Sequence, residues 1–392
     1  MKNTTTAFAL LALCILTASC KKTINVPVAE DFDGTAPKRN ASVRTPVLQP
    51  NFDSLRATLP SSAKERFKKA SNLLLKQNPT LARIVASAVN SIPCSLTPLN
   101  TWLNNQLSDW NSDAYYYATL TGMFNLPTYD ALYFGNGGNN NSYGINGEYS
   151  HTYSKTFKDL KRFWNIESDD MITTPIHGSM LQSRDKIIRT NKIVLKEDEA
   201  TAKYWADLIA WLLQNVPQYR NGEHPIFSFN SYAQASFEFY PYGMIPPKIA
   251  LGDGLISSYA ELGFGDVAPQ AILAHEYAHH VQFQNGVYNS SASASFTRRA
   301  ELMADGLAAY YLSHAQGASM QWKRVKQFLQ VFFNIGDCYF DNSMHHGTPV
   351  QRMAAAEWGY SLASDAQKQG HVLTGQQVIA LFEEKFQKTV VQ

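Results

Sequence analysis

The sequence predicts an α+β protein of 392 residues. Apolar residues recur at helical spacing in several segments of the first third of the chain, which predicts amphipathic helices there. Short runs rich in β-branched and aromatic residues, KIIRTNKIVL (186–195) and PIFSFNS (225–231), are typical of strands. The apolar segment KYWADLIAWLLQNV (203–216) is typical of a buried helix. We therefore expect a mainly helical, loop-rich N-terminal region over 51–165, followed by a compact domain with a small sheet over 166–392.

The first 19 residues are typical of an export signal. Lys2 gives a short basic start, residues 7–16 are apolar, and small residues lead into Cys20. The apolar run is too short to be a permanent membrane-spanning helix. The pattern resembles a bacterial lipoprotein signal, which is cleaved before an acylated cysteine, although Thr17 stands where Leu is usual. We expect a lipid anchor at Cys20 that holds the chain to a membrane of the bacterial cell envelope, facing the periplasm or the surface. An ordinary cleaved signal with a chance cysteine is the alternative.

Export also affects what we expect of the residues that follow the signal. Residues 20–50 are polar, contain prolines and lack a hydrophobic period, which predicts a flexible tether. Cys94 and Cys338 remain once the signal is removed and Cys20 is acylated. In an oxidising compartment these two cysteines could form a disulfide, and two buried free thiols fit equally well.

The remaining elements are predicted from local patterns. Helices are expected at 61–77, 80–92 and 98–110, each with apolar residues at helical spacing. The Gly/Asn-rich segment 134–149 must be a loop or tight hairpin. Its aromatic residues could line a ligand groove, but packed turns fit better. KIALGDGLI (248–256) is typical of a strand, which we expect at the edge of the sheet.

Charge and composition exclude one class of partner. The formal net charge is +2 and charged residues make up 17% of the chain, with no long run of one sign. A nucleic-acid-binding surface needs a concentration of positive charge that this composition does not supply. We therefore expect a globular protein without a nucleic-acid partner.

The segment AILAHEYAHHVQF (271–283) contains the pattern H-E-x-x-H. On a helix, His275 and His279 lie one turn apart on the same face, so both imidazoles can converge on one metal ion. Imidazole nitrogen suits zinc, and three protein ligands plus a water make a catalytic site. Glu276 lies beside the pair, where it can take a proton from that water. The alternative is an ordinary amphipathic core helix.

A carboxylate pair follows the motif in RAELMADG (299–306). Glu301 comes 22 positions after His279, in a segment that continues with helical spacing. A second helix packed on the first could bring the Glu301 carboxylate to the same metal. Asp305, one turn further on, could accept the free N–H of a ligand histidine and fix its tautomer.

These stretches resemble the gluzincin group of zinc metallopeptidases, and more narrowly the bacterial neutral zinc metallopeptidases. That family is marked by HEYGHHVQ, ELQAD and HGT-x-x-QR, and this chain has HEYAHHVQ, ELMAD and HHGTPVQR (345–352). Ala278 and Met303 depart from the family pattern without removing a ligand. The resemblance covers about the last third to two-fifths of the chain, and the N-terminal half has no counterpart.

The resemblance implies a zincin-like metallopeptidase domain whose active-site helix lies behind a small sheet. It implies His275, His279 and Glu301 as ligands of one Zn²⁺ per chain and Glu276 as the catalytic base. The expected activity is hydrolysis of a peptide or protein substrate, as an endopeptidase. The strand at 248–256 is expected to hold the substrate by pairing with it along a free edge.

A further donor would stabilise the oxyanion that forms during hydrolysis in such enzymes. The segment HHGTPVQR offers His345, His346 and Arg352 for this role. For Arg352, a structural salt bridge to the helix ends is an equally good interpretation.

Three other functions compete with the peptidase. A deformylase-like hydrolase would need an upstream cysteine ligand, and Cys94 is the only candidate, far from the motif. A non-catalytic binding lipoprotein could retain the scaffold, although intact Glu276 and Glu301 argue against decay. A cell-envelope interaction protein could use the aromatic-rich segment 113–153 to bind glycan or a partner.

Overall fold

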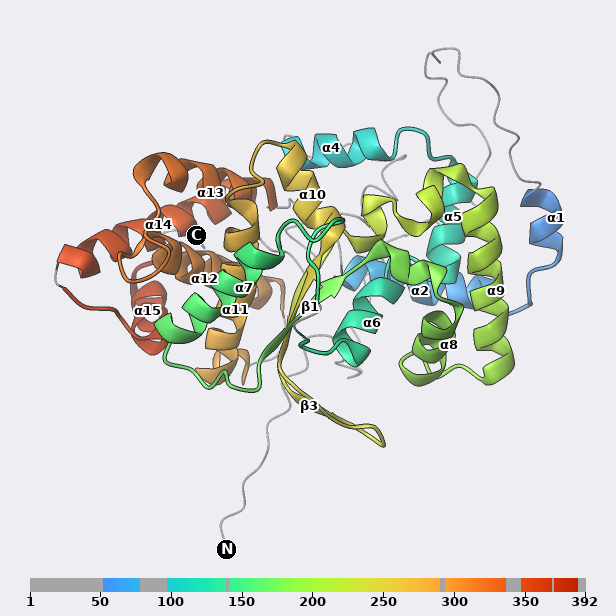
Figure 1. Cartoon of the computed structure of the whole chain (residues 1–392), viewed down its shortest axis with the longest axis horizontal. Coiled ribbons are helices and arrows are strands. Elements are labelled where there is room, and N and C mark those ends of the chain that lie inside the picture. Colours follow the sequence, from blue (N-terminus) through green and yellow to red (C-terminus); the bar gives the residue numbers. More distant parts are fainter. Residues whose placement is uncertain are drawn as a thin grey trace, which may run out of the picture.

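The protein is an α+β molecule in which helices surround a small central sheet (Figure 1). A computed structural model describes residues 52–77, 97–138, 141–289, 293–335, 347–368 and 370–386. The α+β class expected from the sequence is confirmed. Several expectations lie outside the described residues: the signal at 1–19, the tether at 20–50, the helix at 80–92, and Cys20, Cys94, Cys338, His345 and His346.

Three strands form the central sheet in the order β1-β5-β2. β1 (Ile172–Ile176) is parallel to β5 (Lys248–Gly252), and β2 (Ser231–Gln234) is antiparallel to β5. Every residue of β5 is buried. The sequence was right about a strand here but wrong about its place, since β5 is central and helix α10 already begins at Asp253. An apolar run such as KIALG indicates a strand covered on both faces, but it does not indicate how many strands pair with it.

A second pair of strands forms a hairpin between β2 and β5 in the chain. β3 (Phe237–Phe239) pairs antiparallel with β4 (Gly243–Ile245), and the hairpin protrudes from the body (Figure 1). Tyr133 packs against the Phe237 and Phe239 rings at its base. Tyr240 at the tip is 82% exposed.

Helices make up most of the remaining structure. Those before the sheet are α1 (Phe52–Ala57), α2 (Ala63–Gln77), α4 (Pro98–Gln106), α5 (Ser112–Thr121), α6 (Leu126–Phe134) and α7 (Ser150–Phe163). Those after β1 are α8 (Arg184–Ile193), α9 (Glu199–Asn215), α10 (Asp253–Glu261), α11 (Ala268–Gln284), α12 (Ala294–Ser313), α13 (Trp322–Ile335), α14 (Pro349–Lys368) and α15 (Gly375–Leu381). Short helical turns are η1 (Gly178–Gln182), η2 (Pro217–Gly222), η3 (Pro225–Ser228), η4 (Val287–Asn289) and η5 (Phe382–Phe386). Within the described segments, no helix combines the length and apolarity needed to cross a bilayer.

Most helix predictions are confirmed, and two strand predictions are wrong. The predicted helices correspond to α2, α4, α9, α11 and α12. KIIRTNKIVL lies instead in helix α8, which buries Ile187, Thr190 and Asn191 at a spacing of three to four residues against α9. PIFSFNS forms the helical turn η3, and β2 begins only at Ser231. Tertiary packing overrides the strand preference of β-branched residues in both places.

The described residues of the Gly/Asn-rich segment after Phe134 form a loop between α6 and α7, as expected. Gly144 and Gly147 adopt φ values of +86° and +75°, which favour glycine over other residues. Tyr143 in the loop and Tyr153 just after it are 3% and 1% exposed. The interpretation of packed turns is therefore confirmed for these two rings, and they do not line an open groove.

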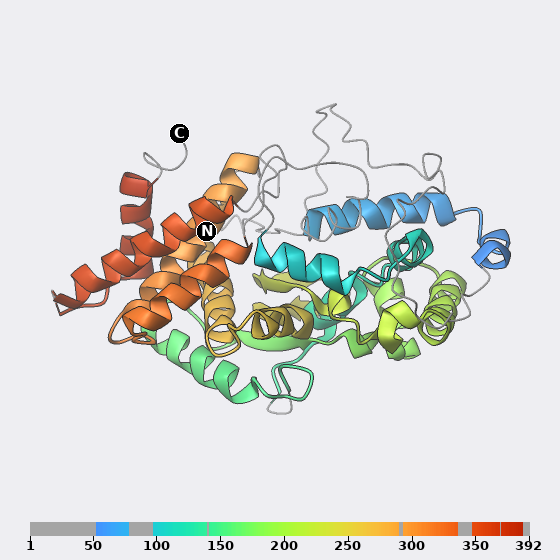
Figure 2. The same ribbon diagram turned by 90° about the horizontal axis from the view of Figure 1, so that it is seen from above.

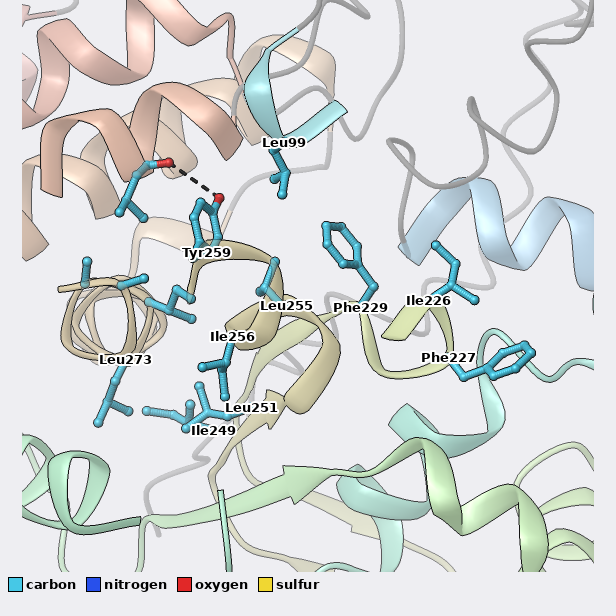
Figure 3. Close-up of a cluster of buried hydrophobic side chains, with 14 of the residues drawn as sticks. Leu99, Ile226, Phe227, Phe229, Ile249, Leu251, Leu255, Ile256, Tyr259 and Leu273 are labelled. Atoms are coloured by element: carbon cyan, nitrogen blue, oxygen red, sulfur yellow. Dashed lines mark hydrogen bonds between the residues drawn. The ribbon is translucent and has the colours of Figure 1, made fainter. Parts of the chain in front are cut away.

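The larger of two hydrophobic clusters among the described residues runs from Phe52 to Phe382. Near the sheet, Ile249 and Leu251 of β5 face Leu273 of α11, and Tyr259 of α10 donates a hydrogen bond of 3.5 Å to the carbonyl of Val331 (Figure 3). Helices α11–α15 gather at one end of the sheet, whereas α1, α2, α5, α8 and α9 lie at the other (Figures 1 and 2). The core continues across residue 165, and the division into regions 51–165 and 166–392 stays a prediction.

The position of β5 in this core predicts the effect of shortening one of its side chains. Ile249 is 0% exposed. Ile249→Ala should lower the free energy of unfolding by about 2–5 kcal/mol, because the lost methyl groups leave a cavity. The matched control is Ile145→Ala, at a side chain 66% exposed, which should change stability by less than about 0.5 kcal/mol. Urea unfolding measures both, and equal losses would contradict the central position of β5.

Candidate metal centre

Helix α11 carries the H-E-x-x-H residues and is covered by other elements. Its residues are buried on all sides over most of its length, because it packs between the sheet, α7 and α12. His275 and His279 lie one turn apart. Their rings meet edge to face, with centroids 4.8 Å apart. The sequence expectation of one shared face is confirmed.

Helix α12 brings a carboxylate to this pair. Glu301 Oε2 lies 3.2 Å from His275 Nε2, and Glu301 Oε1 lies 3.6 Å from His279 Nε2. One ligand atom from each of the three residues fits within 4.8 Å of the others, and all three residues are buried. The group could hold a metal ion, as the sequence predicted.

The donor set indicates which ions would fit. Two imidazole nitrogens and one carboxylate suit zinc and related divalent transition metals. Three protein ligands leave a coordination position for a water or substrate, which is the arrangement of catalytic zinc sites. Both ligand histidines point Nε2 at the shared centre, so Nδ1 is left for outer partners.

The outer partner of His275 is Asp305, as expected. His275 Nδ1 lies 2.9 Å from Asp305 Oδ1, and because a carboxylate accepts, Nδ1 carries the proton. Burial by itself lowers the pKa of His275, but Asp305 and Glu301 more than offset it and raise the pKa to about 9. These carboxylates therefore favour positive charge at the place where a metal cation would sit.

Arg352 lies behind Asp305. Its Nε and Nη2 donate to the two Asp305 oxygens at 2.6 and 2.5 Å, and the guanidinium is buried. Burial by itself lowers the pKa of Arg352, but the effect of the Asp305 carboxylate is larger and raises this pKa. A structural salt bridge is observed, but its partner Asp305 lies within α12 and not at a helix end as expected. Because two of its nitrogens are committed to Asp305, Arg352 does not present them to a substrate oxyanion.

The outer partners of His279 are Gln282 and Tyr288, which sequence reasoning missed. His279 Nδ1 lies 2.9 Å from Gln282 Oε1 and 3.1 Å from the Tyr288 hydroxyl. Burial lowers the pKa of His279. The spacing of three residues between His279 and Gln282 was the only available signal, since Tyr288 lies in the connection after α11.

Glu276 contacts the strand β2. The Ser231 hydroxyl donates a hydrogen bond of 2.5 Å to Glu276 Oε1. β2 is the last strand at one edge of the sheet, and its inner edge pairs with β5. The Glu276 carboxylate therefore faces an edge strand, a contact between residues 45 positions apart that the sequence does not predict.

His280 and His177 have other partners. His280, adjacent to His279, donates a hydrogen bond of 3.1 Å from Nε2 to the carbonyl of Lys248, so Nε2 carries the proton. Burial lowers the pKa of His280 to about 4. His177 pairs instead with Asp253, through Nδ1 and Oδ2 at 2.5 Å. These residues are not part of the metal group found among the described residues.

No family model, curated protein or solved structure matches this chain. The site is therefore interpreted from its own geometry and chemistry.

The ion pair behind His275 predicts a non-additive effect on stability. Asp305→Ala leaves the Arg352 guanidinium buried without its partner, and should lower the free energy of unfolding by about 3–5 kcal/mol. Asp305→Ala/Arg352→Met removes the charge as well, and should be more stable than Asp305→Ala alone. Urea unfolding of the wild type, both single variants and the double variant gives the coupling energy. Purely additive losses would show that the two side chains do not depend on each other.

Proposed function

We propose that this chain is a zinc-dependent peptidase. The observation that carries the proposal is the buried group of His275, His279 and Glu301, with Glu276 beside it on the same helix. The resemblance of HEYAHH, ELMAD and HGTPVQR to gluzincin metallopeptidases supports the same function and a zincin-like fold.

The formal charge of the cluster supports a divalent cation. Metal binding requires both histidines to be neutral, so in a metal-bound site the carboxylates of Glu276, Glu301 and Asp305 would give three negative charges and Arg352 one positive charge. The buried cluster then carries two net negative charges. Buried charges require compensation, and a divalent cation between the ligands supplies it.

Each side chain has a role in hydrolysis. A zinc ion bound there would polarise the peptide carbonyl and lower the pKa of a water molecule. Glu276 accepts the proton of the attacking water and passes it to the leaving nitrogen. The Ser231 hydroxyl, 2.5 Å from Glu276 Oε1, holds that carboxylate toward the edge strand. Asp305 keeps the proton of His275 on Nδ1, so Nε2 faces the ligand group.

The substrate is expected to lie along β2 rather than β5. An extended peptide can pair only with a strand that has a free edge, and β5 is paired on both sides. β2 is an edge strand of this sheet and contacts Glu276 through Ser231. A peptide bound along β2 would therefore pass the catalytic carboxylate, which favours an endopeptidase. Placement in the bacterial cell envelope, through a lipid anchor at Cys20, completes the proposal and rests on the signal pattern alone.

Replacing the base should separate metal binding from hydrolysis. Glu276→Gln removes the proton acceptor but none of the three ligands, so the variant should bind zinc like the wild type. Its hydrolysis of an unfolded protein such as casein should fall by at least about 100-fold, in line with the contribution of general bases. Metal analysis and a peptide-release assay on the same preparations measure the two properties.

Glu223→Gln is the control, because Glu223 lies in an exposed connection away from the metal group. It should retain both zinc and activity. A Glu276→Gln variant that loses its zinc, or one that keeps full activity, would refute the assignment of Glu276 as the base.

A further inference from the structure

His279, the second proposed ligand, has hydrogen-bond partners of its own, separate from Asp305 and Arg352. Gln282 is 0% exposed and lies on α11, less than one turn after His279. Its Oε1 lies 2.9 Å from His279 Nδ1, and its Nε2 donates a hydrogen bond of 2.6 Å to the carbonyl of Ala300. Ala300 directly precedes Glu301 in α12. The Gln282 amide therefore links the His279 ring to the backbone directly before Glu301.

This connection fixes the proton of His279. A carbonyl oxygen can only accept, so the contact of Ala300 with Gln282 requires the NH₂ group of the amide on that side. The amide oxygen must then face His279, and it too can only accept. Nδ1 of His279 therefore carries the proton, and its Nε2 lone pair faces Glu301.

Tyr288 closes the network. Its hydroxyl lies 3.2 Å from Gln282 Oε1, to which it donates, and 3.1 Å from His279 Nδ1. The ring is held between Phe283 and Phe296, with centroids 4.9 and 5.4 Å away. Tyr288 thus ties the connection after α11 to the outer face of the second ligand.

We propose that Gln282, completed by Tyr288, is the positioning residue of the second metal ligand. It holds His279 in the Nδ1–H tautomer and sets the spacing between α11 and α12 on this side of the site. Asp305 performs the matching task for His275 with a charged group, whereas Gln282 does so with a neutral one. The inference rests on the proposed metal site but not on peptide hydrolysis.

Zinc affinity tests the proposal with matched variants on one helix. Gln282→Met keeps the length of the side chain and removes both hydrogen bonds. Gln284→Met is its control, because Gln284 also makes two backbone hydrogen bonds, to Glu167 at 2.7 and 2.5 Å, and touches no ligand. Competition with a chelator should show zinc binding weakened about 10–100-fold in Gln282→Met, as for other partners of ligand histidines. Gln284→Met should bind zinc like the wild type.

If Gln282→Met does not fold, a second pair of variants with a smaller change tests the same proposal. Tyr288→Phe removes one hydroxyl from the network and should weaken zinc binding several-fold, by analogy with other outer-partner losses. Tyr277→Phe is the control, since Tyr277 is buried on α11 on the face away from the ligands and packs against Phe157. Equal zinc affinity in Tyr288→Phe and Tyr277→Phe, or in Gln282→Met and Gln284→Met, would overturn the proposal.

The tautomer of His279 provides a readout that needs no metal. Nitrogen-15 NMR of the metal-free wild type should show His279 protonated on Nδ1, and Gln282→Met should shift it toward a mixture of tautomers. An unchanged tautomer in Gln282→Met would overturn the inference. If the wild type binds no zinc but Gln282→Met still shifts the tautomer of His279, the proposed function is refuted and the positioning role of Gln282 remains supported.

Discussion

The buried carboxylate of Asp305 is the group on which the rest of the site depends. It accepts from His275 of α11 and from Arg352 of α14, while lying itself on α12. Burying these groups costs solvation free energy, which close pairing offsets only if every partner stays in place. Three helices are therefore held in one arrangement by one residue, and the orientation of the first ligand follows from it.

The two candidate ligand histidines, His275 and His279, lie in different electrostatic surroundings. His275 has a carboxylate behind it, which raises the basicity of the ring and attracts positive charge. His279 has the neutral amide of Gln282, which orients the ring without adding charge. If both outer partners were carboxylates, the buried cluster would carry more negative charge than one divalent ion cancels. With this asymmetry, a single divalent cation would balance the formal charges of the site.

Much of the candidate site could be predicted from the sequence because its central contacts are local. His275 and His279 are one helical turn apart, and Glu301 and Asp305 are too, so helical geometry alone predicts which side chains share a face. Local spacing also predicts Gln282 as a neighbour of His279, but not that its amide reaches the next helix.

The contacts that sequence analysis missed are between distant segments. Ser231 meets Glu276 only because β2 pairs with β5 and α11 packs across both. The placement of KIALG at an edge failed for the same reason, since pairing with β1 on the far side leaves no local trace. The helix at Arg184–Ile193 was mistaken for a strand because its β-branched residues suit both structures, and packing on α9 decided between them.

The most direct test of the central claim, that this buried group is a catalytic zinc centre, is zinc X-ray absorption spectroscopy on the purified, zinc-loaded chain. The account predicts one zinc per chain with two imidazole nitrogens and carboxylate and water oxygens at about 2.0–2.2 Å, and no sulfur. A sulfur shell at about 2.3 Å would place the ion at cysteines instead. A chain that retains no zinc would contradict the account altogether.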